Sequence, residues 1–293
     1  MHTQISQPKD LQEAWSLRQR FDEDGCYISG GTWLRTQWEA KAFEMSSQLI
    51  SLDKLLETKG ISEKEILADS LEISIGAMTT LAECTTSSII QRYLLPLFEA
   101  CKAIAAPSIR NQGTIGGNIL TTTGDSITAL LLYDTKLCWY GGKGLEVEPL
   151  EAWLLKRKAG VIKKERRILV KLQIPIVVSE VEEGFSFYQK VGRREAFIPS
   201  VVTVAAKWIS VESDSIQSIA ISAGGGSAIP MRLSKAEQVL EMQKRNKLYY
   251  PKIQKVIKEE YEPATDAFAS GEYRKIMAAN VILSEFHKWS TKS

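Results

Sequence analysis

The chain has 293 residues, 44% of them hydrophobic and 25% charged, a balance that indicates a globular protein of one large or two medium domains and argues against disorder. The net charge of +2 gives no overall case for nucleic acid or an anionic membrane as a partner. The apolar runs are too short to span a bilayer and residues 1–8 lack the features of a secretory signal, so we expect a cytoplasmic protein.

Histidine and cysteine are too sparse to predict a metal site. The histidines, His2 and His287, lie at opposite ends of the chain, and no two cysteines form a C-x-x-C pair. We therefore expect buried free thiols and no metal ligands, and a bound cofactor would carry any enzymatic chemistry. The cysteines are Cys26, Cys84, Cys101 and Cys138.

The chain opens with a predicted helix, a strand and a glycine loop. Apolar spacing over residues 8–21 predicts an amphipathic helix, and residues 26–28 read as a short buried strand. Ser29-Gly30-Gly31-Thr32 follows, and then a predicted helix over residues 33–38. Strand, double glycine and helix make a candidate phosphate loop, although the G-x-G-x-x-G spacing of a Rossmann fingerprint is missing.

Strands and helices then alternate up to a second glycine stretch. Residues 48–52 and 71–76 read as strands, and polar residues 57–67 between them as loop with some helix. Helical spacing covers residues 79–84 and 89–106, with a break expected at Pro96.

The second glycine stretch runs from Ile109 to Asn118 and is followed by Gly124-Asp125-Ser126. Glycine accepts positive φ and lets a ligand approach the backbone, so the stretch is either a phosphate cradle or a pair of tight turns. Asp125 can cap the following helix.

Two strands and a basic cluster complete the first half. Residues 136–140 and 144–147 read as strands joined by glycines, and residues 168–174 as a strand ended by Pro175. The basic residues at 156–158 and 163–167 are interpreted as a solvated face, with a docking surface for an acidic partner as the alternative. A domain boundary is expected at residues 179–184.

The second half predicts strands first and helices after. Residues 201–209 and 216–222 read as strands, and the glycine run at 224–226 is interpreted as a structural turn, with a phosphate loop as the alternative. Helices are expected within residues 236–242, 250–259 and 270–289. The fold class is therefore α+β.

These motifs and the basic segment from Lys190 to Phe197, taken in order, resemble the FAD-binding medium subunit of the molybdenum hydroxylases, the xanthine dehydrogenase and carbon monoxide dehydrogenase family. The resemblance covers nearly the whole chain. It implies a vanillyl-alcohol-oxidase-type (PCMH) FAD-binding domain over residues 1–178, with two α+β subdomains split near residue 53. A smaller α+β C-terminal domain of antiparallel sheet plus helices would follow over residues 184–290. The segments that carry the resemblance are Ser29-Gly30-Gly31-Thr32, Ile109 to Asn118, Gly124-Asp125-Ser126 and Lys190 to Phe197.

The resemblance also implies the cofactor site. In the family both glycine loops cradle the FAD pyrophosphate, the aspartate binds the ribose–phosphate region, and the basic segment lies near the flavin. Lys190, Arg193 and Arg194 are the candidates for tuning the flavin, and no side chain is expected to be catalytic. The family pattern is broken at Trp33 and in the short linker between Asn118 and Asp125. The implied cofactor-binding residues are Ser29, Gly30, Gly31, Thr32, Trp33, Leu34, Ile109, Asn111, Gly113, Thr114, Ile115, Gly116, Gly117, Asn118, Asp125 and Lys190.

The implied function is electron transfer within a complex. A molybdopterin-bearing large subunit would oxidise a substrate, for which xanthine or another purine is the favoured interpretation. A 2Fe–2S small subunit would pass the electrons to FAD on this chain. NAD is a possible acceptor. A stand-alone FAD oxidase of the same fold and an FAD-free scaffold subunit remain alternatives.

Overall fold

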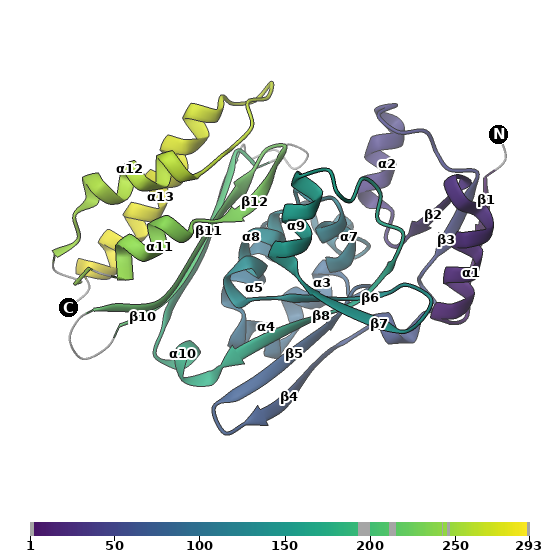
Figure 1. Cartoon of the computed structure of the whole chain (residues 1–293), viewed down its shortest axis with the longest axis horizontal. Coiled ribbons are helices and arrows are strands. Elements are labelled where there is room, and N and C mark those ends of the chain that lie inside the picture. Colours follow the sequence, from purple (N-terminus) through teal and green to yellow (C-terminus); the bar gives the residue numbers. More distant parts are fainter. Residues whose placement is uncertain (1–2, 193–199, 211–214, 242, 245–246, 292–293) are drawn as a thin grey trace.

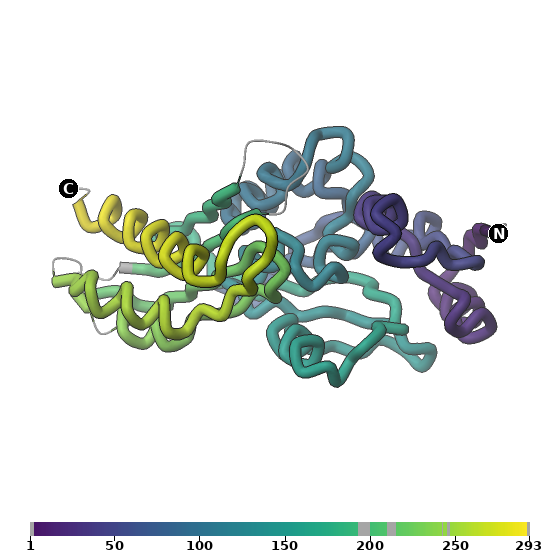
Figure 2. The backbone as a smooth tube through the Cα atoms, turned by 90° about the horizontal axis from the view of Figure 1, so that it is seen from above, coloured from purple at the N-terminus to yellow at the C-terminus, as the bar shows by residue number. Residues whose placement is uncertain are grey.

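The computed structural model describes residues 3–192, 200–210, 215–241, 243–244 and 247–291, in three packed units. The units follow one another along the long axis of the molecule, with the N-terminal unit at one end and the C-terminal helices at the other (Figure 1). The view from above shows the same order (Figure 2).

The N-terminal unit is a small parallel sheet of order β1-β3-β2 with helices packed beside it. The side chain of Asp10 caps α1 by accepting a hydrogen bond from the backbone of Glu13, as N-terminal capping residues do. Ala14 and Ile50 lie in its buried core. Its elements are β1 (Gln4–Ser6), α1 (Leu11–Phe21), η1 (Asp22–Asp24), β2 (Gly25–Ile28), α2 (Thr32–Glu39) and β3 (Gln48–Ser51).

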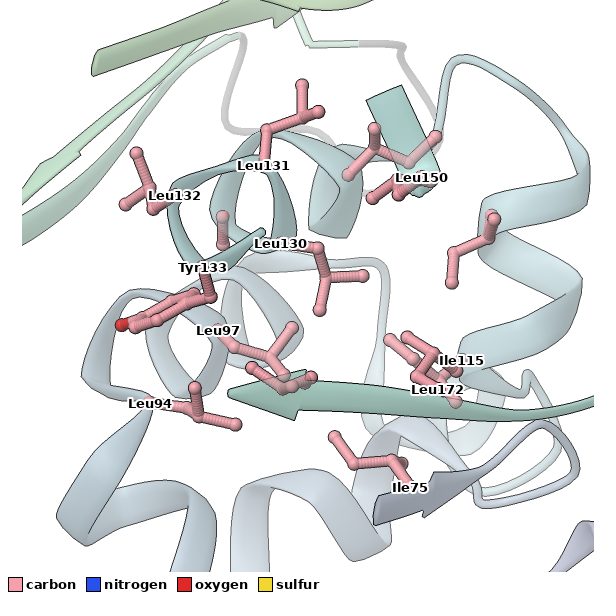
Figure 3. Packing of buried hydrophobic residues seen from close by; sticks show 14 of the residues in the cluster. Ile75, Leu94, Leu97, Ile115, Leu130, Leu131, Leu132, Tyr133, Leu150 and Leu172 are labelled. Atoms are coloured by element: carbon pink, nitrogen blue, oxygen red, sulfur yellow. The ribbon is translucent and has the colours of Figure 1, made fainter. Parts of the chain in front are cut away.

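The middle unit is a five-stranded antiparallel sheet of order β4-β5-β8-β6-β7, covered on one face by helices. Ile75 of β5 and Leu172 of β8 point into the core with Leu97, Ile115 and Leu130 from the helices (Figure 3). Its strands are β4 (Ile61–Leu67), β5 (Ser70–Gly76), β6 (Lys136–Tyr140), β7 (Leu145–Pro149) and β8 (Ile168–Val177). Its helical segments are η2 (Leu56–Thr58), α3 (Leu81–Thr86), α4 (Ser88–Tyr93), α5 (Leu95–Ala103), α6 (Pro107–Arg110), α7 (Ile115–Leu120), α8 (Asp125–Leu130), η3 (Leu131–Tyr133) and α9 (Leu150–Lys158).

Two expectations about this sheet are wrong. Residues 61–67, expected as loop, form β4, an edge strand whose side chains are mostly exposed, so its sequence lacks the alternation of a half-buried strand. Strand β8 does not end at Pro175, because beyond Gln173 it pairs with β5 alone. A proline is tolerated where a strand has a free side.

The basic cluster at residues 156–167 forms ion pairs within the chain. Arg167 lies 2.7 Å from Glu148 and 2.9 Å from Glu165, and Lys164 lies 2.9 Å from Glu23. Its lysines are solvated, as expected, but Arg167 is only 22% exposed.

The C-terminal unit is an antiparallel sheet of order β12-β11-β10-β9 with helices on one face (Figure 1). The glycine run turns β11 into β12, with φ of +111° at Gly225 and +65° at Gly226, values that favour glycine. It is the structural turn that the sequence predicts. The elements are α10 (Val178–Glu182), β9 (Phe185–Val191), β10 (Val202–Ser210), β11 (Ile216–Gly225), β12 (Ala228–Arg232), α11 (Ser234–Glu241), α12 (Tyr250–Glu260) and α13 (Gly271–Thr291).

The other face of this sheet packs on the middle unit. Tyr188, Ala205 and Ala220 belong to the core of the middle unit, whereas their neighbours Val204 and Ile221 belong to the core beneath the C-terminal helices. This alternation follows from the period of two along a strand, and it makes the sheet a wall shared by both cores.

Candidate functional site

The two glycine loops meet at Gly30. A Cβ atom built on Gly30 would lie 1.8 Å from the carbonyl oxygen of Gln112 and 3.1 Å from the nitrogen of Gly113. No side chain fits at this distance, so glycine is required where the loops touch. The predicted pairing of two loops about eighty residues apart is thus formed by direct backbone contact.

The first loop leaves backbone donors at the start of α2. Gly31, in the left-handed conformation with φ of +66°, precedes the helix and no side chain caps it. Arg35 is the first residue to donate a helical hydrogen bond, to the carbonyl of Gly31 at 2.9 Å. The N–H groups of residues 32–34 come before that bond and are available to an anion.

The second loop uses its backbone donors internally. The N–H groups of Ile115 and Gly116 donate to the carbonyls of Thr79 and Ala77, each at 2.9 Å. The next two, of Gly117 and Asn118, donate to the side chain and backbone of Thr114. The second loop is therefore held by its own hydrogen bonds, and the unused backbone N–H groups are those of the first loop.

Gly116 and Gly117 face different surroundings. A Cβ on Gly116 would lie 2.7 Å from both the Cβ and the carbonyl oxygen of Ala77, so this glycine serves packing against the end of β5. A Cβ on Gly117 would instead approach the hydroxyl oxygens of Thr114 at 3.0 Å and Ser29 at 3.2 Å. Only Gly117 faces the junction between the loops.

Polar side chains of both loops lie close to this junction or follow it along the chain. The Thr114 hydroxyl donates to Ser29 Oγ at 3.1 Å. Asn118 Oδ1 accepts hydrogen bonds from Ser126 N at 3.2 Å and Ser126 Oγ at 2.6 Å. Within the described part of the chain, the Asn118 amide nitrogen and the Thr32 hydroxyl make no hydrogen bond, so both are free to donate to a ligand.

The other implied residues lie at the margin of the junction. Trp33 is 42% exposed, with its ring centroid 5.7 Å from that of Phe43. Leu34 and Ile109 are half-buried and Asn111 is exposed. The carbonyl of Ile109 accepts from Gly113 N at 2.7 Å, so its role in the loop is structural.

Asp125 joins the middle unit to the C-terminal sheet. Its Oδ2 lies 2.7 Å from Lys190 Nζ and its Oδ1 accepts from the Ser200 hydroxyl at 2.7 Å. Lys190 also donates to the Ala103 carbonyl at 3.1 Å. The structure thus brings together Asp125 and Lys190, whereas Arg193 and Arg194 lie outside the described residues.

Sequence reasoning missed Ser200 and Tyr188. Tyr188 stands two residues before Lys190 on β9 and shares its face, a signal that the period of a strand could have supplied. Its hydroxyl is buried with no hydrogen-bond partner among the described residues. Burial, and next the charge of Asp125, raise its pKa well above the usual range. Ser200 has no comparable sequence signal, because only tertiary packing brings it to Asp125.

No metal centre is visible in the described ranges: no three histidine, cysteine, aspartate or glutamate side chains gather in a cluster that could hold an ion. Among these residues there is also no helix long and apolar enough to cross a bilayer.

Comparison with known families finds matches over both halves of the chain. Residues 1–177 match the family model of the FAD binding domain in molybdopterin dehydrogenase, and residues 186–289 match that of the CO dehydrogenase flavoprotein C-terminal domain. The expected fold class, a flavin-binding domain followed by a smaller α+β domain, is confirmed.

Individual relatives extend over most of the chain. The xanthine dehydrogenase FAD-binding subunit of Escherichia coli O157:H7 is 29% identical over 229 residues, 77% of this chain and 75% of that one. The carbon monoxide dehydrogenase medium chain of Hydrogenophaga pseudoflava is 29% identical over 57% of each chain. A solved structure of carbon monoxide dehydrogenase from the same organism superposes with a TM-score of 0.82 and 23% identity, covering 96% of this chain and 95% of that one. The chain therefore belongs to the family of the FAD-binding domain in molybdopterin dehydrogenases.

Proposed function

We propose that the chain is the FAD-carrying oxidoreductase subunit of a molybdenum hydroxylase complex. One observation carries this proposal: in a chain of this family, two distant glycine loops touch and leave unused donors at the start of α2. A helix N-terminus preceded by glycine is suited to a pyrophosphate, which is anionic and needs close approach to the backbone.

The residues at the junction fit the FAD pyrophosphate. The N–H groups of residues 32–34, the Thr32 hydroxyl and the Asn118 amide would donate to it, since none is used within the described chain. Gly117 would leave room beside Ser29 and Thr114. Other implied residues would act through the shape of the loops. The backbone at Gly30, Gly31, Gly113, Ile115 and Gly116 sets the course of the two loops. The side chains of Trp33, Leu34, Ile109 and Asn111 lie at their margin.

FAD, when bound, accepts electrons from one partner and passes them to another. This chain would hold and orient the cofactor, with Lys190, which is paired with Asp125, as the candidate for tuning the flavin and no side chain acting as an acid or base. We propose a molybdopterin-binding large subunit and a 2Fe–2S small subunit as partners, because a relative of this chain is named a medium chain. NAD is the proposed acceptor.

We further propose xanthine or another purine as the substrate of the complex. The support is the relative named as a xanthine dehydrogenase subunit, which covers more of the chain than the carbon monoxide dehydrogenase relative does. The substrate would be oxidised on the large subunit, so its identity is tested on the complex and not on this chain.

Purification of the chain from its native source tests the proposal. We expect a yellow protein with a flavin absorption band, FAD identified by mass, and one larger and one smaller partner that co-purify. A yellow protein that oxidises a substrate without partners would instead favour the stand-alone oxidase. A complex that lacks flavin, and binds none when FAD is added, would favour the scaffold subunit.

A further inference from the structure

We propose that Asp125 is a positioning residue that couples docking of the C-terminal sheet to the order of the cofactor loops. The proposal rests on the proposed function, because the loops are taken to bind FAD. In this role Asp125 acts through α8, the helix that lies between α7 and the C-terminal sheet (Figure 1).

On the cofactor side, the first turn of α8 and the end of the second glycine loop form one unit. Asn118 accepts two hydrogen bonds from Ser126, the second residue of α8. A Cβ on Gly124 would lie 2.2 Å from Asn118 Oδ1, so the residue before α8 is packed directly on the same side chain. A shift of α8 therefore displaces Asn118, one of the proposed FAD donors.

On the sheet side, both oxygens of Asp125 are bound by residues beyond the middle unit. Lys190 comes from β9 and Ser200 from the residues just before β10, each at 2.7 Å. Asp125 is 14% exposed and Lys190 22%, so water screens this ion pair less than one on the surface. The Asp125 carboxylate thus connects the first turn of α8 to β9 and to the segment that leads into β10.

A second contact further along α8 repeats the connection. The hydroxyls of Thr128 and Thr203 lie 2.8 Å apart and are fully buried, and Ser222 donates to the Thr128 carbonyl at 2.5 Å. The helix is therefore attached to β9, β10 and β11 along its length. Because coupling between two sites is reciprocal, FAD binding should strengthen docking of the sheet, and loss of docking should weaken FAD binding.

FAD titration of the full chain, freed of flavin, tests this coupling. Ser200→Ala and Thr203→Val change residues that touch α8 but none of the proposed FAD donors. We expect each to raise the FAD dissociation constant by about fivefold or more, within the usual range of coupling between sites, and Asp125→Asn to raise it further. Melting curves confirm that each variant is folded at the assay temperature.

Two controls make the result specific. Thr203→Ser keeps the hydroxyl bonded to Thr128 and should restore wild-type affinity. Ser290→Ala removes a hydrogen bond to Tyr250 within the C-terminal helices, away from α8, and should leave the affinity unchanged.

The outcomes separate this inference from the proposed function. Wild-type affinity in Ser200→Ala and Thr203→Val, with loss only in Asp125→Asn, would overturn the coupling and assign Asp125 to direct contact with FAD. A wild-type chain that binds no FAD would overturn the proposed function, and the coupling with it.

Discussion

Gly30 is the residue on which contact between the two loops depends. In Gly30→Ala the methyl group would overlap the Gln112 carbonyl, 1.8 Å away, so the loops must separate. We expect the flavin-to-protein ratio after purification, measured by absorbance, to fall below that of the wild type, because overpacking costs on the order of 1–3 kcal/mol, about 5- to 150-fold in affinity.

A glycine elsewhere provides the control for this substitution. In Gly141→Ala the new methyl would meet only side-chain atoms and no backbone, Glu146 Oε1 at 3.3 Å and Arg167 Cγ at 3.7 Å. Its flavin ratio should equal that of the wild type. Full flavin occupancy in Gly30→Ala would show that the loops do not need this contact to hold FAD.

Tyr188 and Tyr261 test what a buried phenol contributes. The Tyr188 hydroxyl has no partner among the described residues, whereas the Tyr261 hydroxyl donates to the Gly224 carbonyl at 2.7 Å. Tyr188→Phe should leave the free energy of unfolding unchanged or raise it by up to about 1 kcal/mol, since an unsatisfied group is removed. Tyr261→Phe should lower it by about 1–2 kcal/mol, because a carbonyl loses its partner. Equal losses in denaturant melts would indicate an unrecognised partner for Tyr188.

At the scale of elements, the sequence predicts the helices and strands whose alternation of apolar and polar residues reflects which of their faces is buried. Helix α1 and strands β5, β10 and β11 carry clear periodicity and lie where expected. The edge strand β4 could not be predicted, because its side chains are exposed on both faces and only its pairing with β5 makes it a strand.

The candidate site was predictable to the same extent. Glycine spacing identified both loops, since close backbone contact requires glycine at Gly30 and Gly116. What the sequence could not reveal is which loop keeps free donors, because the hydrogen bonds of the second loop run to Ala77 and Thr79, distant residues with no marking pattern.

The hydrogen bonds between Asn118 and the first turn of α8 connect the second glycine loop to this helix. Asn118→Ala removes the side chain that accepts a hydrogen bond from the first-turn N–H of Ser126, and it should lower the free energy of unfolding by about 1 kcal/mol, as loss of a hydrogen bond at a helix N-terminus does. Asn118→Asp keeps the acceptor and adds a negative charge that favours a helix N-terminus, so stability should be retained. The same variant replaces the free amide donor with a carboxylate, and its FAD affinity should fall. Equal loss of melting temperature in both variants would argue against a stabilising role for the hydrogen bond from Ser126 to Asn118.

At the scale of the whole molecule, the C-terminal sheet belongs to two cores. Tyr188 and Ala205 complete the core of the middle unit, and Trp208 stacks in the core beneath the C-terminal helices, 4.5 Å from Phe286 between ring centroids. Separation of these units would expose both faces of the sheet to water. Because the sheet contributes Tyr188, Ala205 and Ala220 to the core of the middle unit, exposure of this face would destabilise both units.

We therefore expect the middle and C-terminal units to unfold in one cooperative transition. Trp139 and Trp153 report on the middle core, and Trp208 and Trp289 report on the C-terminal core. Variants in which phenylalanine replaces every tryptophan except one of these pairs should give coincident fluorescence transitions in denaturant, matching the loss of helical circular dichroism.

Thr203→Val leaves the Thr128 hydroxyl buried without a partner. It should lower the free energy of unfolding measured by either tryptophan pair by the same amount, about 1–3 kcal/mol. If the fluorescence of the C-terminal pair instead changes at a lower denaturant concentration than that of the middle pair, the C-terminal unit unfolds independently. The contacts between the sheet and the middle core would then contribute little to the stability of either unit.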